Sequence, residues 1–224
     1  MTRAQKARIV EAMESYMRAD AYGRSRINSL YFDTPDHRLI RRSLEKPTYK
    51  EKLRVRSYGI ATPDSIVFAE LKKKYRSVVY KRRIALTEAQ TIAFLCGRVP
   101  IPDSQIAREI AYFVQYYAPI QPSMLLSYER EAFYGREDGA FRITFDENVL
   151  WRDSELSLCA PVDGEVLLND DAVLMEVKCA GAIPLWLTSI LSELQIYKTS
   201  FSKYGTAYRI TQQRKQQGGV FYVE

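Results

Sequence analysis

The chain contains 224 residues, 46% of them hydrophobic and 27% charged, which is enough apolar sequence for a buried core and excludes a disordered chain. The formal net charge of +6 favours an anionic partner, although basicity alone does not separate nucleic acid, phosphates and anionic lipids. No segment approaches the roughly 20 apolar residues of a membrane helix, and there is no signal-peptide pattern. We therefore expect a cytoplasmic protein without a membrane span.

The first part of the chain predicts a helix, a strand and a short second helix. Apolar residues spaced three or four apart predict a helix over 4–19. The segment 26–33 predicts a strand, and 34–44 predicts a helix with Thr34 as its N-cap and Pro35 at its first helical position.

The central part predicts a strand meander followed by two helices. Three successive strands are expected over 48–58, 65–74 and 77–86. The next helix has Thr87 as its N-cap and ends at Gly97. A second helix is predicted over 103–117.

The last part predicts an antiparallel strand pair, a single strand and two helices. These elements are expected over 123–135, 140–152, 172–180, 184–194 and 200–213. Because the strands come in meander groups, we predict an α+β fold: an antiparallel β-barrel or strongly curved sheet of about eight strands, with helices packed outside. We expect a single domain over 1–213 and a polar tail over 214–224.

The most distinctive pattern is a row of cations on alternate positions of one predicted strand. In the sequence TYKEKLRVRS, side chains alternate between the two faces, so Lys50, Lys52, Arg54 and Arg56 share one face. Later predicted strands repeat this arrangement, each with its charged residues on one face of the strand. These residues are Glu70, Lys72, Lys74, Lys81, Arg83, Arg130, Arg142, Asp146, Glu176 and Lys178.

Apolar residues occupy the opposite parity of the last predicted strands. They are Phe141, Ile143, Phe145, Met175 and Val177. We predict that these side chains pack against the outer helices while the charged ones face inward.

The charged residues on one face of these strands have a simple explanation and a functional one. A charged strand face is most often only solvated, but like charges directly opposite each other destabilise a sheet. The repetition therefore favours a bound polyanion, carried with a metal ion. A nucleic-acid-binding sheet is less favoured, because Glu70, Asp146 and Glu176 interrupt the basic face.

The cysteines and the single histidine exclude several site types. Cys96, Cys159 and Cys179 lie far apart without C-x-x-C spacing, which argues against a disulfide framework or a zinc site. His37 lies in the polar segment TPDHR, so we expect it to begin a helix rather than to act in catalysis.

Eight short segments in a fixed order resemble a known family. They are SLYFDT, KLRVRSYG, AELKKK, VVYKRRIAL, SYEREAF, FRITFD, MEVK and SFSKY. Over about residues 26–210 they resemble the polyphosphate polymerase domain of the vacuolar transporter chaperone family, the VTC domain, in its bacterial form. That domain belongs to the triphosphate tunnel metalloenzymes, which include the CYTH-type triphosphatases. The resemblance implies an eight-stranded antiparallel barrel with a charged lumen.

The resemblance also implies roles for individual residues. The expected catalytic tunnel cations are Arg54, Arg56, Lys72, Lys81, Arg130 and Arg142. Further phosphate contacts are expected from Lys178, Ser202 and Lys203, and the strand parity adds Lys52. Ser202 alternatively only caps the last helix.

The resemblance implies a divalent cofactor, Mn²⁺ or Mg²⁺. Glu176 corresponds to the metal-binding glutamate, with a salt bridge to a neighbouring lysine as its alternative. Glu70 is either a second ligand or an ion-pair partner. The implied activity is synthesis of inorganic polyphosphate from ATP. Hydrolysis of tripolyphosphate or a nucleoside triphosphate, and non-catalytic polyphosphate binding, are the alternatives. A membrane-protein partner is compatible with each of them.

Two departures from the family pattern bear on activity. The family has a strand of the type R-x-E-x-K-Y before the first helix, and this sequence starts at that helix, so we expect the strand and its lysine to be missing. Ser200 stands where the family often has a lysine, for which Lys198 would partly compensate.

Overall fold

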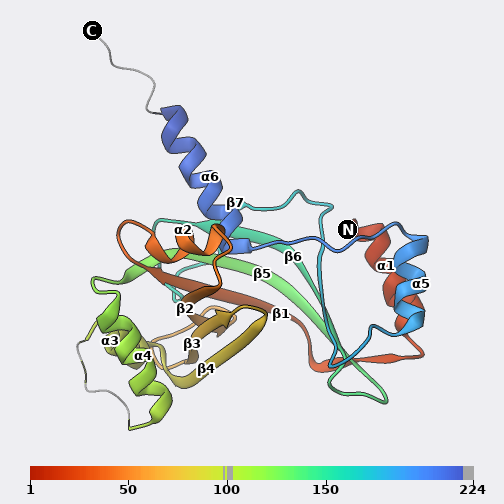
Figure 1. The fold of residues 1–224 in the computed structure, drawn as a ribbon, viewed down its shortest axis with the longest axis horizontal. Helices are drawn as coiled ribbons and strands as arrows, with labels where there is room; N and C mark the ends of the chain where they lie inside the picture. The colour runs from red at the N-terminus through yellow and green to blue at the C-terminus, as the bar shows by residue number, and fades with distance from the viewer. Residues whose placement is uncertain (98, 100–102, 219–224) are drawn as a thin grey trace. The chain divides into compact units, whose positions relative to one another are not determined.

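The computed structural model describes residues 1–97, 99 and 103–218, which form two compact units (Figure 1). Unit 1 comprises Met1–Ile27, Tyr128–Leu150 and Leu168–Ser200. Unit 2 comprises Asn28–Ser127, Trp151–Leu167 and Phe201–Glu224.

Eight strands and six helices are present in the described residues. The strands are β1 (Met17–Asp33), β2 (Tyr49–Tyr58), β3 (Ile66–Tyr75), β4 (Val78–Thr87), β5 (Gln121–Gly135), β6 (Arg142–Arg152), β7 (Glu165–Val166) and β8 (Leu174–Lys178). The helices are α1 (Arg3–Met13), α2 (Arg38–Leu44), α3 (Glu88–Leu95), α4 (Gln105–Tyr116), α5 (Leu185–Glu193) and α6 (Lys203–Gly218). The α+β class is confirmed.

The strands form one sheet in the order β4-β3-β2-β1-β5-β6-β7, and β8 pairs with β6. Within the described part of the chain, no pairing joins the two ends of this order, so the expected closed barrel is not formed. The short end strand explains this, because β7 has only two residues and offers few backbone groups for pairing.

In unit 2, α3 and α4 cover one face of the β2–β3–β4 meander (Figure 1). Leu53 and Val55 of β2 and Leu71 of β3 are fully buried there, packed with Phe94 and Ile110 of the two helices. Burying side chains of this size stabilises the fold by roughly 1.5–3 kcal/mol each. The period-two alternation predicted for these strands is confirmed, and the opposite face is left to the charged residues.

The predicted start and end of α3 are also confirmed. Thr87 Oγ1 accepts a hydrogen bond from the Gln90 N–H over 3.2 Å, and the Gln90 side chain accepts one from the Thr87 N–H, which forms a capping box. Gly97 follows the helix with φ of +68°, a conformation that favours glycine.

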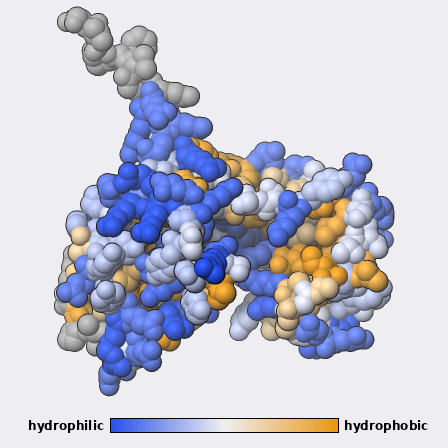
Figure 2. Space-filling view, in the orientation of Figure 1, coloured by the Kyte–Doolittle hydropathy of each residue, from blue (hydrophilic) through white to orange (hydrophobic). Residues whose placement is uncertain are grey.

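In unit 1, α1 and α5 cover the apolar face of β6 and β8. Phe141, Ile143 and Phe145 are buried together with Ile9 of α1 and Leu187 of α5. Met175 and Val177 pack against the same cluster, so the predicted facing of these strands is confirmed. Figure 2 shows apolar surface over this pair of helices, where Leu185 is 83% exposed.

The first helix is shorter than predicted. It ends at Met13, and β1 begins at Met17, so the helix expected over 4–19 is wrong in its second half. Met17 is buried in the same cluster as Met13, although it lies on a strand. Its apolar spacing therefore reflected a shared core rather than a continuous helix.

The second helix starts later than predicted. His37 is its N-cap, with φ of 56°, and Pro35 lies outside the helix. Thr34 Oγ1 still accepts from the Arg38 N–H over 2.9 Å. The carboxylate of Asp33 accepts from the N–H groups of Leu39 and Ile40, so it satisfies the first helical turn in place of the expected cap.

No strand precedes α1 in the described residues, and Thr2 forms an isolated bridge with Ala172. The helix predicted over 200–213 is α6, which extends to Gly218; residues 219–224 of the predicted tail lie outside the described residues. None of the helices described combines the length and apolar content needed to cross a membrane.

Candidate functional site

One face of the β2–β3–β4 meander in unit 2 is basic. Antiparallel pairing places Lys52 opposite Lys72, and Lys72 opposite Lys81, so three lysines share one cross-strand row. In the next row Lys50 is opposite Lys74. We call this surface the basic strand face; its residues are Lys50, Lys52, Arg54, Arg56, Lys72, Lys74, Lys81 and Arg83.

The lysines of the basic strand face lie close enough to affect one another. Lys52 Nζ donates to Ser202 Oγ over 3.3 Å. Burial lowers the pKa of the Lys52 ammonium, Tyr31 opposes that effect, and the charge of Lys50 adds to it. Burial also lowers the pKa of Lys50, and its lysine neighbours lower it further. The lysine ammonium groups of this face therefore repel one another, which disfavours their charged forms.

Glu70 lies in the middle of this face and is only 1% exposed. Arg54 Nε donates to Glu70 Oε2 over 2.8 Å, and Lys81 Nζ lies 2.7 Å from Oε1. Arg83 Nε lies 3.5 Å from Oε1. Burial acts to raise the pKa of this carboxyl, but the charges of Arg54, Arg56 and Lys81 lower it to about 2. Of the two roles predicted for Glu70, this geometry favours the ion-pair partner.

A tyrosine that the sequence did not single out lies beside the two arginines. Arg54 Nη1 donates to the Tyr31 hydroxyl over 3.2 Å. Burial acts to raise the pKa of Tyr31, but Arg54, Lys52 and Arg56 together lower it to about 8. Arg56 is 8% exposed, and its Nε donates to Ser29 Oγ over 3.4 Å.

Ser202 has the capping role predicted for it, and it also lies beside the basic strand face. Its hydroxyl oxygen accepts from the Gly205 N–H over 3.2 Å, and its carbonyl accepts from the Thr206 N–H over 2.8 Å, so it caps α6. The same hydroxyl contacts Lys52, which brings the start of α6 to the basic strand face. Lys203 is the first residue of α6 and is half-buried.

Unit 1 carries the remaining predicted site residues. Arg130 Nε and Nη2 donate to the two carboxylate oxygens of Asp146 over 2.6 and 2.7 Å, a bidentate pair. Burial acts to lower the pKa of Arg130, but its hydrogen bond to Asp146 and the charges of Tyr128, Asp146 and Glu176 raise it. Arg130 is therefore a fixed cation.

Glu176 and its neighbours follow on β8. Pairing with β6 places Glu176 opposite Thr144 and Lys178 opposite Arg142, which repeats the apposition of like charges. Lys178 Nζ lies 3.4 Å from Glu176 Oε1, and both side chains are more than half exposed.

The described residues limit how a divalent cation would be held. No group of three His, Cys, Asp or Glu side chains that could bind a metal occurs among residues 1–97, 99 and 103–218. Asp146 and Glu70 are already engaged by arginine and lysine. Of the three acidic site residues Glu70, Asp146 and Glu176, the last is the accessible carboxylate. One carboxylate with phosphate and water oxygens suffices for Mg²⁺. The residues therefore fit a cation that arrives with its phosphate.

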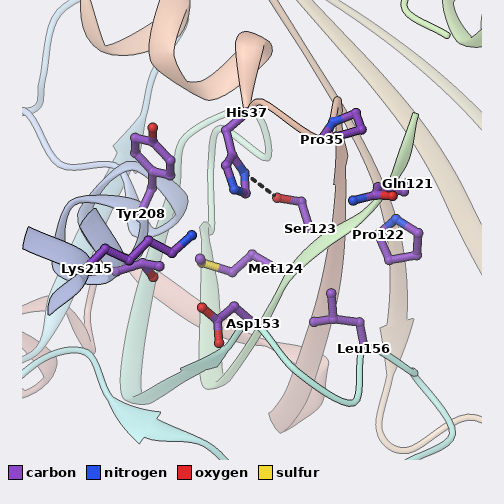
Figure 3. Close-up of a pocket in the computed structure, with 11 residues that line it drawn as sticks. Pro35, His37, Gln121, Pro122, Ser123, Met124, Asp153, Leu156, Tyr208 and Lys215 are labelled. Carbon is purple, nitrogen blue, oxygen red and sulfur yellow. Dashed lines mark hydrogen bonds between the residues drawn. The ribbon is translucent and has the colours of Figure 1, made fainter. Parts of the chain in front are cut away.

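A cavity of about 160 Å³ lies in unit 2 between the middle of α6, the start of α2 and the start of β5 (Figure 3). Its lining includes Pro35, His37, Ser123, Asp153, Tyr208 and Lys215. His37 Nδ1 and Ser123 Oγ are 3.1 Å apart, and Ser123 Oγ lies 3.0 Å from the Tyr204 hydroxyl. Burial lowers the pKa of His37, and Asp33 opposes this effect.

Comparison with known proteins supports the fold. Two solved structures, each described as a "putative adenylate cyclase", resemble the chain. The protein from Bacillus halodurans has a TM-score of 0.56 and 13% identity, covering 90% of this chain and 89% of that one. The protein from Vibrio parahaemolyticus has a TM-score of 0.45 and 11% identity, covering 92% and 91%. At 13% identity, the first likeness shows the fold alone. No curated protein sequence matches the chain.

The sequence comparison is more specific. A family model described as the VTC domain matches residues 2–212, which is nearly the whole chain. The eight ordered segments fall within this match, so the predicted resemblance is confirmed. The chain belongs to the VTC domain family.

Proposed function

We propose that the protein is a metal-dependent phosphotransferase that synthesises inorganic polyphosphate from ATP, with the phosphate chain bound along the basic strand face as one wall of a triphosphate tunnel. The observation that carries this proposal is the cross-strand row of Lys52, Lys72 and Lys81. Like charges in register oppose folding, and a bound polyanion supplies the charge that offsets them.

The layout of the face favours a linear anion over a single phosphate. Rows of the same parity repeat about every 6.8 Å along a strand, because residues i and i+2 are separated by two rises of about 3.4 Å. Positive charge therefore continues from the Lys50 row to Arg56 rather than meeting at one point. A phosphate chain presents its negative charge in the same way.

The residue roles follow from their chemistry. Arg54 and Arg56 would each donate hydrogen bonds to oxygens of the reacting phosphates. The lysines of the row would act as point charges beside the rest of the phosphate chain. Phosphoryl transfer needs alignment and charge neutralisation more than a nucleophilic side chain. The attacking group would be a terminal phosphate oxygen of the growing chain.

The residues of unit 1 are assigned through the family resemblance. Arg130, Arg142 and Lys178 would bind phosphate oxygens, and Glu176 would hold Mn²⁺ or Mg²⁺. When bound, the cation adds neutralising charge to the phosphate oxygens. The bidentate pair with Asp146, which fixes the Arg130 side chain, supports this assignment.

The decisive experiment separates chain growth from hydrolysis. Purified protein is incubated with ATP and Mn²⁺, with Mg²⁺ in parallel, and the products are resolved on a polyacrylamide gel stained for polyphosphate. We expect a ladder of long chains with release of ADP. The double variant Arg54→Ala/Arg56→Ala should give none, while Arg82→Ala, a neighbouring strand arginine paired with Glu109 over 3.0 Å, should behave like the wild type.

Other results would overturn the polymerase assignment in distinct ways. Orthophosphate release without a ladder, lost in the double variant, would identify a triphosphatase. Tight tripolyphosphate binding without turnover would identify a polyphosphate-binding module. Equal activity in the wild type and the double variant would remove the basic strand face from the site.

A further inference from the structure

The Arg54 guanidinium is shared between two oxygen groups of different kinds. Its Nε and Nη2 contact the buried carboxylate of Glu70, which also forms an ion pair with Lys81. Its Nη1 donates to the hydroxyl of Tyr31, which is half-buried on β1. The Glu70 oxygens are enclosed by cations, whereas the Tyr31 contact is a single hydrogen bond of 3.2 Å. Tyr31 is therefore the neighbour of Arg54 that a ligand can replace more easily.

The position of the Tyr31 ring is fixed by its contact with Tyr204 of α6. The two rings stack with centroids 4.6 Å apart. The Tyr204 hydroxyl donates to Asp33 Oδ2 over 2.9 Å and also lies 3.0 Å from Ser123 Oγ. Asp33 is fully buried and accepts backbone N–H groups of α2. Tyr204 is thus a positioning residue that holds the Tyr31 hydroxyl toward Arg54.

The charges that face the Tyr31 hydroxyl are mostly positive. From β2 they are Arg54, Lys52 and Arg56, and from α6 the polar neighbour is Tyr204. Burial and the charge of Asp33 raise the pKa of Tyr204, so Tyr31 is the member of the stacked pair that ionises. Its phenolate would be an internal anion placed where the phosphate chain is proposed to bind.

We propose that the Tyr31 hydroxyl is a displaceable counter-group of the basic strand face: in its ionised form it neutralises Arg54 when no phosphate chain is bound, and that form takes up one proton from solvent when the chain replaces it. This inference rests on the proposed function and deepens it. The step is balanced as phenolate plus a proton giving phenol, with no other bond made or broken. Below the pKa that Tyr31 has in the ligand-free protein, its hydroxyl is already neutral and instead donates a hydrogen bond to a phosphate oxygen.

The sign of the pH effect follows from this linkage. In the free protein the pKa of Tyr31 is about 8, and a bound polyanion raises it again by neutralising the surrounding cations. Affinity for a phosphate chain is then unaffected by Tyr31 below pH 8 and falls above it. One proton per ligand predicts a loss of about tenfold between pH 7 and pH 9.

The test is an ultraviolet titration at 295 nm, where tyrosinate absorbs. Of the 16 tyrosines, one should ionise with a midpoint near pH 8 in the wild type, and this step should be absent in Tyr31→Phe. The variant keeps the ring that stacks on Tyr204, so it should fold. Tyr112→Phe, at an exposed position on α4, should keep the step. Adding saturating tripolyphosphate to the wild type at pH 8.5 should reverse it.

Calorimetry with tripolyphosphate at pH 7 and pH 9 completes the test. The tenfold loss of affinity should shrink in Tyr31→Phe, leaving only the parts due to lysine deprotonation and to ionisation of the ligand itself, which both proteins share. Measurable tripolyphosphate heat with unchanged absorbance, or the same early ionisation in Tyr31→Phe, would overturn the displacement while leaving the proposed function intact. No tripolyphosphate heat at either pH would overturn the proposed function and the displacement together.

Discussion

In unit 1, the outer face of the long strands carries cations and carboxylates in matched pairs. Lys6 of α1 contacts Glu131 and Glu147, and Arg24 contacts Glu147 and Glu129. In unit 2, the basic strand face sets lysine against lysine across three strands, and its one central carboxylate, Glu70, is shared by several cations. The first arrangement is complete within the protein. The second sets lysines opposite one another, and we propose that an added anion offsets their repulsion.

This difference separates charges that hold the fold from charges that hold a ligand. A pair of opposite charges loses stability when either partner is removed, because the other is left buried without compensation. A row of like charges gains stability when one member is removed, and loses affinity for the anion. Substitutions in the ion pairs and substitutions in the lysine row should therefore change the free energy of unfolding with opposite sign.

The largest expected effect is at Glu70. Replacing Glu70 with Ala leaves Arg54, Lys81 and Arg83 without their shared carboxylate, and we expect a loss of about 3–5 kcal/mol in the free energy of unfolding. Urea denaturation measures this loss. Glu137→Ala, at an exposed position, should change stability by less than about 0.5 kcal/mol. Equal, small effects of both substitutions would contradict the assigned role of Glu70.

The acid sensitivity of unit 2 follows from the same carboxyl. The pKa of Glu70 is lowered from 4.5 to about 2 in the folded protein, so its contribution is complete above pH 4.5 and is lost as the pH falls toward 2. The shift corresponds to about 3 kcal/mol. Urea midpoints measured between pH 5 and pH 2 should fall less steeply for Glu70→Gln than for the wild type. Parallel curves would show that Glu70 does not titrate in this window.

A smaller loss is expected in unit 1. Lys6→Met removes the cation between Glu131 and Glu147 and should lower the free energy of unfolding by about 2 kcal/mol, since the lysine is mostly buried. Affinity for tripolyphosphate should not change. A matched loss of affinity would mean that unit 1 charges also act in binding.

Much of the fold could be predicted because strand periodicity is local. The alternation in KLRVRS and FRITFD placed Leu53 and Ile143 in cores and Arg54 and Arg142 on the other face, as observed. The capping box at Thr87 was equally local. The prediction of a helix over 4–19 failed because Met17 satisfied the helical spacing while belonging to a strand.

Other parts of the site depend on contacts that periodicity does not specify. Tyr31 lies between Leu30 and Phe32, both buried, so SLYFD resembles a simple core strand. Its role depends on Arg54 of β2 and on Tyr204 of α6, which is 173 residues away. The pairing of Lys6 with Glu131 likewise joins distant segments. Closure of the sheet depends on pairing between its end strands, which no single segment predicts.

The smallest expected effect has the opposite sign. Lys72→Ala removes the middle member of the lysine row and should raise the free energy of unfolding of the ligand-free protein by about 0.5 kcal/mol at low salt. Added salt should reduce this gain, because it screens exposed charges. Lys73→Ala, which removes a cation 4.0 Å from Glu51, should give no gain. A loss of stability in Lys72→Ala would count against like-charge repulsion in this row.

The central claim is that the basic strand face binds a phosphate chain, and calorimetric titration with tripolyphosphate tests it most directly. Lys72 and Lys73 are adjacent on β3 and project from opposite faces of the strand. We predict that Lys73→Ala binds like the wild type and that Lys72→Ala binds at least about tenfold more weakly, the equivalent of about 1.4 kcal/mol. Equal affinity in all three proteins would contradict the claim.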